Sequence, residues 1–160
     1  MRVGFGYDIH PLAYGRNMIL GGVHIPFDRG LQGHSDADVL CHAVSDSLLG
    51  AAALGDIGMY FPDDDPQYKD VSSLDLLRQA FTVIKKIRYR VVNVDATIVA
   101  QAPKIAPHRE AMVQNLSWAL EMSPSSVSVK ATTNEHLGPV GRGEAIAAYA
   151  VCLIEIEGKG

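Results

Sequence analysis

The sequence feature that most constrains the fold is residues 33–46, where histidine and acidic side chains adjoin a helix-like run of apolar residues. Ser35 or Asp36 can cap a helix, because a short side-chain oxygen accepts hydrogen bonds from the unpaired amides of the first turn. Ser35 with Asp38 three residues later is also close to a capping box. We therefore predict a helix that begins at about residue 36 and ends at about residue 54, next to a glycine that suits a helix C-cap.

The N-terminal segment predicts a strand. Apolar side chains alternate with small or polar residues from residue 2 to residue 10. Because successive side chains of a strand point to opposite faces, Asp8 and His10 lie on the same side of its end. Pro11 has no amide hydrogen to give to a sheet and is expected to end the strand. The plainer interpretation of the pair is a turn residue and a half-exposed strand end.

Asp8, His10 and His42 form the candidate metal site. The predicted helix places Asp38, His42 and Asp46 at i, i+4 and i+8, one turn apart on one face. Imidazole nitrogen and carboxylate oxygen are zinc ligands, and a catalytic site keeps one position open for water or substrate. Asp46 either orients His42 through its other ring nitrogen or is solvated. Asp38 is either an acid that contacts the metal ligands without binding the metal itself, or a group that binds substrate hydroxyls.

The overall composition limits the classes of partner. With 160 residues, the chain is expected to be one domain, residues 1–160. The net charge of −4 predicts no basic surface for nucleic acid or an anionic membrane. No apolar run approaches the ~20 residues that cross a bilayer, and the N-terminus lacks the apolar core of a signal peptide. Cys41 and Cys152 are isolated in the sequence, which fits a reducing compartment, so we expect a cytoplasmic protein.

The remaining pattern predicts an α+β fold. We expect helices on one face of a mostly antiparallel or mixed sheet, an α/β sandwich of the ferredoxin-like kind. Trp118 is expected to pack in the core or at an interface. The predicted elements are a hairpin at 18–25 around Gly21 and Gly22, loops at 28–33 and 55–66, helices at 72–88 and 107–120, strands at 90–101, 127–133 and 145–156, and a glycine-rich turn at 134–143.

Two further polar groups are candidates for binding. His34 and Ser35 precede the predicted helix, where free amides and the helix dipole favour an anion such as phosphate, although Ser35 as a plain cap is equally open. The other group lies in loops and at strand ends, where binding residues are common. It offers two cations that can neutralise phosphate, two hydroxyls and a carboxylate suited to Mg²⁺. Its members are Lys104, Thr132, Thr133, Glu135 and Arg142.

Several short segments, taken together, resemble a known family. They are residues 7–10, 33–43, 55–58, 61–62, 100–104, 130–135 and 141–144. On these segments the sequence resembles the 2-C-methyl-D-erythritol 2,4-cyclodiphosphate synthases over nearly its whole length. The resemblance implies a homotrimer with its sheets around a threefold axis. It also implies a lyase of non-mevalonate isoprenoid biosynthesis, which converts 4-diphosphocytidyl-2-C-methyl-D-erythritol 2-phosphate into the 2,4-cyclodiphosphate and CMP.

The resemblance also implies roles for individual residues. Asp8, His10 and His42 would hold Zn²⁺ or another divalent metal, and Glu135 would bind Mg²⁺ or Mn²⁺ together with the substrate phosphates. The implied catalytic residues are His34, Lys104, Thr133 and Asp56. The implied substrate-binding residues are Asp8, His10, His34, Ser35, Asp56, Ile57, Gly58, Phe61, Asp63, Ala100, Lys104, Ile105, Ala106, Thr132, Thr133, Asn134, Glu135 and Arg142.

By the same resemblance, each active site lies between two subunits, with the metal ligands on one and the cytidine pocket on its neighbour. A cavity on the threefold axis near Arg142 would hold an isoprenoid diphosphate. The attacking phosphate oxygen is already anionic, so the reaction needs alignment and charge stabilisation rather than a strong base. Two rival functions are a zinc-dependent phosphatase or phosphodiesterase, in which the same ligands activate water, and a non-catalytic nucleotide-binding trimer.

Overall fold

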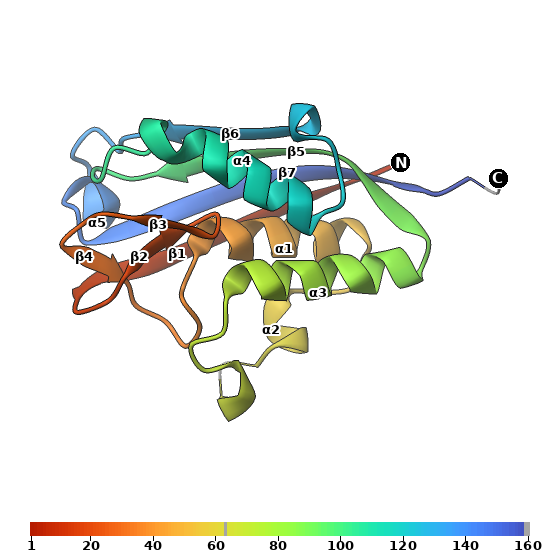
Figure 1. The fold of residues 1–160 in the computed structure, drawn as a ribbon, viewed down its shortest axis with the longest axis horizontal. Coiled ribbons are helices and arrows are strands. Elements are labelled where there is room, and N and C mark those ends of the chain that lie inside the picture. The colour runs from red at the N-terminus through yellow and green to blue at the C-terminus, as the bar shows by residue number, and fades with distance from the viewer. Residues whose placement is uncertain (63, 159–160) are drawn as a thin grey trace.

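The computed structural model describes residues 1–62 and 64–158. The helices α1 (Val39–Ala51) and α4 (Arg109–Ala119) lie against one face of a five-stranded sheet, and α3 (Ser73–Lys86) packs on both helices (Figure 1). Within the described residues, none of the helices has the length and apolar content needed to cross a membrane. The strands follow the order β4 (Arg29–Leu31), β1 (Arg2–Tyr14), β7 (Ala145–Ile156), β5 (Tyr89–Val99) and β6 (Val127–Thr132). Shorter elements are β2 (Met18–Leu20), β3 (Val23–Ile25), α2 (Ile57–Tyr60), α5 (Gly138–Gly141) and the 3₁₀ helices η1 (Pro66–Tyr68), η2 (Ala106–His108) and η3 (Pro124–Ser126).

The sheet is mixed, as the sequence predicts. β1 pairs antiparallel with β4 and β7, β7 pairs antiparallel with β5, and β5 pairs parallel with β6. The α+β class is therefore confirmed, while the ferredoxin-like assignment stays a prediction. The hairpin β2–β3 is also confirmed: Gly21 and Gly22 have φ of 56° and 68°, and a two-residue turn with both φ angles positive favours glycine.

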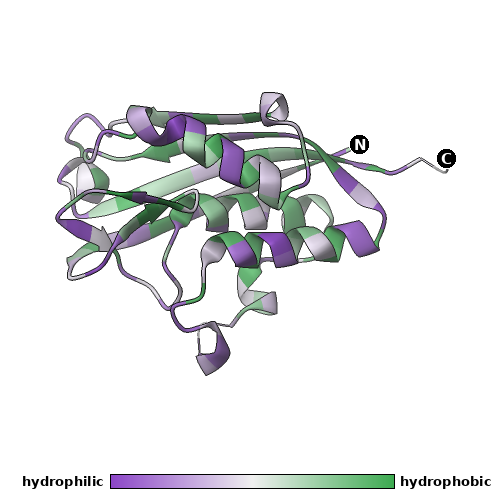
Figure 2. Cartoon of the chain, viewed as in Figure 1, coloured by the Kyte–Doolittle hydropathy of each residue, from purple (hydrophilic) through white to green (hydrophobic). Residues whose placement is uncertain are grey.

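Alternation along the strands separates a buried face of the sheet from an exposed one. On β7, even-numbered side chains such as Ala148 and Ala150 are buried under the helices, whereas Tyr149 and Val151 are exposed. Hydrophilic and hydrophobic segments alternate along α3 in Figure 2, as expected for a helix that buries one stripe. Its buried residues are Ser73, Leu76, Leu77, Ala80, Phe81 and Ile84.

Two glycines of β1 allow α1 to approach the sheet closely. A Cβ atom on Gly4 would lie 1.9 Å from the carbonyl oxygen of Ser47, and one on Gly6 would lie 1.9 Å from that of Ala43. Any side chain at these positions would overlap the backbone of α1, so the approach depends on glycine. It is this approach that brings His42, the neighbour of Ala43, to the face of β1 that carries the predicted ligands.

Asp38, rather than Ser35 or Asp36, caps α1. Ala37 has a φ of 60°, which is not helical, and the helix begins only after Asp38. The predicted start near residue 36 and the capping box are therefore wrong. The local pattern places acids at both 36 and 38, and only the path of the chain between them selects the second as the cap.

The Asp38 carboxylate also joins α1 to the β2–β3 hairpin. Its Oδ1 accepts from the amides of Leu40 and Cys41, both at 3.1 Å, and its Oδ2 accepts from the amide of Gly22 at 2.7 Å. The side chain is fully buried, and burial raises the pKa of Asp38. Because Asp38 has no exposed surface, the second of its two predicted roles, binding of substrate hydroxyls, is wrong.

Pro11 does not end β1, which continues past it. The strand changes partners at this point: Pro11 is opposite Ala145 of β7, and Leu12 is opposite Leu31 of β4. Pro11, which has no amide hydrogen, thus lies where β1 changes from pairing with β7 to pairing with β4. Its carbonyl oxygen accepts a hydrogen bond from the amide of Gln32 at 2.9 Å. The loop predicted after the hairpin accordingly contains the short edge strand β4.

Other boundaries differ by a few residues. α1 ends at Ala51 rather than near residue 54, and the third long helix begins as η2, with α4 starting at Arg109. The glycine-rich turn contains the one-turn helix α5. Trp118 is 58% exposed rather than in the core, with the guanidinium of Arg78 4.2 Å from its ring centroid.

The face of the sheet opposite α1 is apolar and exposed. Val3, Phe5 and Tyr7 of β1 keep 67%, 62% and 43% of their surface exposed. Tyr149 of β7 joins them, with its ring centroid 5.0 Å from that of Tyr7 and 6.3 Å from that of Phe5. A contiguous apolar surface of this kind commonly marks a site of interaction with another protein surface.

Candidate metal centre and adjoining cavity

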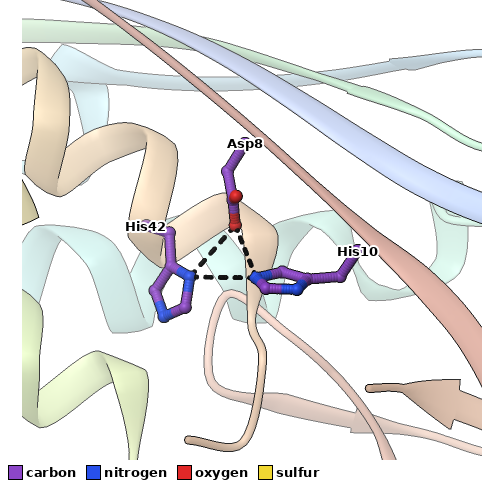
Figure 3. A group of neighbouring side chains, drawn as sticks. All are labelled: Asp8, His10 and His42. Atoms are coloured by element: carbon purple, nitrogen blue, oxygen red, sulfur yellow. Dashed lines mark hydrogen bonds and ion pairs between the residues drawn. The ribbon is translucent and has the colours of Figure 1, made fainter. Parts of the chain in front are cut away.

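The structure brings the three predicted metal ligands together. Asp8 Oδ2 lies 3.0 Å from His10 Nε2 and 3.0 Å from His42 Nδ1, and the two ring nitrogens are 3.4 Å apart (Figure 3). β1 supplies Asp8 and His10 from the face covered by α1, and α1 supplies His42 from its first turn. Each residue thus offers one ligand atom, and all of these atoms lie within 4.8 Å of one another.

The donor set suits a divalent metal ion. A carboxylate oxygen and two imidazole nitrogens are ligand types that zinc prefers, and three protein ligands leave one position for substrate. The side chains of Asp8, His10 and His42 are 23%, 22% and 15% exposed, so the ligands are partly shielded but still reachable from solvent. The residues present therefore fit the metal that their chemistry implies.

The carboxylate and the imidazoles control one another's protonation. Burial acts to raise the pKa of Asp8, but the hydrogen bonds and charges of His10 and His42 outweigh it and hold that pKa well below its usual range. Burial acts to lower the pKa of His42, but the hydrogen bond and charge of Asp8 outweigh it and raise that pKa. A divalent cation would compete with these protons for the same atoms.

In the metal-free protein, His42 is expected to stabilise the fold less as the pH rises. The raised pKa of His42 contributes stability that is fully present below its unfolded value of about 6.5 and is lost as the pH rises through the folded value. The free energy of unfolding of the wild type and of His42→Asn, measured without metal between about pH 6 and 8, should therefore converge. With Zn²⁺ present the two should diverge, because zinc binds the neutral ring. Parallel profiles in both conditions would contradict this coupling.

The other ring nitrogen of His42 faces two serines. His42 Nε2 lies 3.0 Å from Ser73 Oγ and 3.3 Å from Ser35 Oγ. Asp46, the sequence-based candidate for orienting His42, instead accepts from the amide of Ile57 at 2.8 Å and so joins α2 to α1. Burial raises the pKa of Asp46. Ser73 was missed because only packing of α3 on α1 brings it to the site.

The metal centre opens onto a cavity of about 140 Å³. His34, Ser35 and Asp46 form polar parts of its wall beside the ligands. The rest of the wall is largely apolar and is formed by Ile57, Gly58, Phe61, Tyr68 and Leu76. A concave site with a few polar groups on an apolar wall is typical of small-molecule binding.

The loop that carries His34 and Ser35 is held in place from two sides. Arg16 Nη2 donates to the carbonyl oxygens of Gly33 at 3.3 Å and Ser35 at 2.8 Å. His34 Nε2 donates to the carbonyl oxygen of Asp65 at 3.0 Å. Sequence reasoning missed Arg16, since a single arginine in a loop has no spacing signal and its role appears only through these contacts.

The substrate-binding residues predicted in the segment after α1 do not all lie in the cavity. Ile57, Gly58 and Phe61 line the cavity. Asp56 is exposed and caps α2, because its carboxylate accepts from an amide of that helix at 3.1 Å. Asp63 lies outside the residues that the structure describes.

A second surface is formed by the substrate-binding residues predicted after β5. Those that the resemblance implies for the cytidine pocket are Ala100, Lys104 and Ile105, with Thr132 and Thr133. The amide of Ala100, which follows β5, donates to the carbonyl of Thr132 at 3.0 Å. The register aligns Ile9, Ala147, Val99 and Thr132, so β1 and β6 are separated by three strand spacings, about 14 Å. Ala100 and Ile105 are buried. The exposed members are Lys104, Ala106, Thr132, Thr133, Asn134, Glu135 and Arg142.

Known proteins match the chain over nearly its full length. A family model described as the YgbB family matches residues 1–155. The 2-C-methyl-D-erythritol 2,4-cyclodiphosphate synthase of Methylobacillus flagellatus is 59% identical over 155 residues, which cover 97% of each chain. That of Syntrophobacter fumaroxidans is 54% identical over 159 residues, covering 99% of this chain and 100% of the relative.

Solved structures match the fold as well. IspF of Plasmodium falciparum, in a CDP complex, has a TM-score of 0.86 at 37% identity, covering 98% of this chain and 97% of that one. The bifunctional IspDF of Campylobacter jejuni has a TM-score of 0.94 at 38% identity over 98% of this chain, which spans 42% of that longer chain. With its family model, relatives and metal-ligand geometry in agreement, the chain belongs to the YgbB family of 2-C-methyl-D-erythritol 2,4-cyclodiphosphate synthases.

Proposed function

We propose that this synthase forms its product by an intramolecular attack. An oxygen of the 2-phosphate of 4-diphosphocytidyl-2-C-methyl-D-erythritol 2-phosphate bonds to the β-phosphorus. The bond from that phosphorus to the bridging oxygen breaks, and CMP leaves with the electron pair. The supporting observation is the convergence of Asp8, His10 and His42 beside a cavity that also contains His34 and Ser35.

The chain's own residues would align and neutralise phosphate rather than remove a proton. The attacking oxygen is already anionic, so positioning and charge stabilisation supply most of the rate. Ser35 and His34 would contact phosphate at the cavity wall, and the bond from His34 to the Asp65 carbonyl limits rotation of the ring. Lys104 and Thr133 would hold the departing CMP, and Asp56 would bind the erythritol portion.

Asp8, His10 and His42 would hold Zn²⁺ or another divalent cation, which supplies Lewis-acid polarisation of a substrate phosphate when bound. Glu135 would bind Mg²⁺ or Mn²⁺ with the substrate phosphates, since a carboxylate oxygen is a preferred ligand of these ions. The Thr133 hydroxyl donates to the Glu135 carboxylate, which orients it on the exposed turn after β6.

We further propose a homotrimer in which each site combines the metal centre of one subunit with the cytidine pocket of the next. Two observations support it. The metal ligands and the cytidine residues lie on separate surfaces of one chain, with β1 and β6 about 14 Å apart in the sheet. The exposed apolar face around Phe5, Tyr7 and Tyr149 offers a surface for packing sheets around a threefold axis.

A mixture of two inactive variants is expected to regain activity if the sites are shared. His42→Ala disables the metal half and Lys104→Ala the cytidine half. In trimers formed at random from equal amounts of both, about a quarter of the sites combine two intact halves, because each half is intact with a probability of about one half. Turnover after co-expression, with each variant alone as the control, measures this. Turnover no higher than that of the single variants, in a sample where mass spectrometry finds mixed trimers, would contradict shared sites.

Phosphorus NMR with the cytidine-linked substrate, Zn²⁺ and Mg²⁺ tests the reaction. The cyclase produces the cyclic diphosphate and CMP in equal amounts and no inorganic phosphate. A zinc-dependent phosphatase or phosphodiesterase, which activates water, would produce inorganic phosphate or a linear product. A non-catalytic nucleotide-binding trimer would leave the substrate unchanged. Either of the last two outcomes would overturn the proposal.

The remaining parts of the proposal concern regulation and location. An isoprenoid diphosphate would occupy a cavity on the threefold axis near Arg142. In the single chain Arg142 forms a bidentate ion pair with Glu144, at 2.8 and 3.0 Å, so a diphosphate would have to compete with this carboxylate. The cytoplasm is the proposed compartment, in keeping with the two unpaired, buried cysteines Cys41 and Cys152.

A further inference from the structure

Asp36 and Ser73 are connected to each other and to the metal centre. Asp36 Oδ2 accepts from the amide of Ser73 at 3.1 Å, and Asp36 Oδ1 accepts from the Ser73 hydroxyl. Ser73 is the first residue of α3 and is fully buried. Its Oγ lies 3.0 Å from Nε2 of His42, the ring nitrogen on the opposite side from Asp8. The contacts therefore connect the Asp36 carboxylate, through the Ser73 hydroxyl, to the ring nitrogen of His42 that faces away from Asp8.

The donors and acceptors in this chain of contacts have one consistent direction. An ionised carboxylate can only accept, so the single hydroxyl proton of Ser73 goes to Asp36. The Ser73 oxygen is left to accept, and the proton must come from His42 Nε2. A neutral imidazole carries one proton, for which the Ser73 oxygen at Nε2 competes with the Asp8 carboxylate at Nδ1. When the proton is on Nε2, the lone pair of Nδ1 is directed toward Asp8 and His10.

Ser35 supports the same direction. Its Oγ accepts from the amide of Ala37 at 3.1 Å and lies 3.1 Å from Ser73 Oγ. The Ser35 hydroxyl proton can therefore be donated to the second lone pair of the Ser73 oxygen. Hydrogen bonds in a series polarise one another at low dielectric, and this site is buried on the Ser73 side.

We propose that Asp36 and Ser73 are positioning residues that hold the His42 ring and its Nε2-protonated tautomer, so that Nδ1 is free to bind metal. The inference rests on the proposed role of His42 as a ligand. Ligating histidines usually donate their other N–H to an acceptor, and loss of that acceptor typically lowers metal affinity by 10–100-fold. Here the acceptor is a serine hydroxyl that is itself oriented by a carboxylate from a different loop.

A purely structural role is the alternative, because Asp36 also caps the start of α3 through the Ser73 amide. Ser73→Ala separates the two roles: it removes the hydroxyl but keeps the amide bond to Asp36. Ser117→Ala is the matched control, since Ser117 is a 3% exposed serine of α4 whose hydroxyl donates to the main-chain carbonyls of Val113 and Gln114. Asp36→Asn, which keeps an acceptor oxygen, and Asp36→Ala form a second pair.

Two measurements test the proposal without relying on turnover. In metal-free protein at a pH where the ring is neutral, nitrogen NMR of His42, assigned with His42→Asn, reports which ring nitrogen carries the proton. Chelator competition reports the affinity for Zn²⁺. Ser73→Ala should populate the other tautomer and bind Zn²⁺ about 10–100-fold more weakly. Asp36→Ala should change both in the same direction, Asp36→Asn should change them less, and Ser117→Ala should match the wild type.

Each outcome has a distinct meaning. If Ser73→Ala retains the wild-type tautomer and zinc affinity while only its melting temperature falls, the pair is structural and the proposal is overturned. If His42→Asn itself binds Zn²⁺ as the wild type does, the metal site under the proposed function is wrong. The tautomer measurement would then still decide whether Asp36 and Ser73 position the ring.

Discussion

His42→Ala is expected to lower cyclase turnover by more than ~100-fold and to remove tight binding of Zn²⁺. The expected loss exceeds the 10–100-fold that is typical when a residue hydrogen-bonded to a metal ligand is substituted, because here a ligand itself is removed. His42 Nδ1 is one of the three atoms that converge at the metal centre, so Asp8 and His10 alone would leave the ion undercoordinated. Phosphorus NMR of product formation and zinc content by chelator competition measure the two effects.

His24→Ala is the matched control for this substitution. His24 is an exposed residue of β3, so its removal deletes the same side chain without touching the cavity. Its turnover and zinc content should equal those of the wild type. Full turnover of His42→Ala with metal still bound would show that the reaction does not depend on this centre.

Gly6→Ala is expected to lower the free energy of unfolding by about 3 kcal/mol or more, the upper range for overpacking a close-packed interior. A Cβ at this position would lie 1.9 Å from the carbonyl oxygen of Ala43 and 2.8 Å from the amide nitrogen of Ser47. These are backbone atoms of α1, so the helix as a whole would have to move away from β1. Chemical denaturation of the metal-free protein measures the loss.

Gly50→Ala provides the comparison with the same chemical change. Gly50 lies in α1 itself, and an added Cβ would meet nothing closer than the carbonyl oxygen of Phe5 at 3.9 Å. Alanine is favoured over glycine in a helix interior by up to about 1 kcal/mol. Gly50→Ala should therefore be neutral or stabilising. Equal destabilisation by both substitutions would show that the close approach of α1 to β1 is not the cause.

Displacement of α1 would also affect the metal centre, because His42 adjoins Ala43. Any Gly6→Ala protein that remains folded should hold zinc more weakly than the wild type, since His42 would move relative to Asp8 and His10. The small residues in the N-terminal strand are thus part of the site, although they contribute no ligand atom. Their role in helix packing explains why a glycine alternates with the apolar residues there.

Much of the site could be predicted from local rules. The period of a strand put Asp8 and His10 on one face, and the period of a helix put His42 on one face with Asp38 and Asp46. Only the packing of α1 on β1 brings His42 to Asp8 and His10. The turn at Gly21 and Gly22 was recognisable because two consecutive positive φ angles favour glycine. The start of α1 was not, since the sequence offers several cap residues and the positive φ of Ala37 selects Asp38.

The identities of the predicted ligands and the order of strands and helices were determined by the sequence itself, because periodicity and side-chain chemistry act over a few residues. Only the tertiary structure decided which groups contact those ligands and the loop beside them. Ser73 reaches His42 across 31 positions, and Arg16 reaches the carbonyl of Ser35 across 19. Such contacts depend on how α3 packs on α1 and on where the loops lie relative to one another. The periodicity of a single helix or strand cannot predict them. For the same reason Asp46, one turn from His42 in the helix, turned out to hold the amide of Ile57 instead.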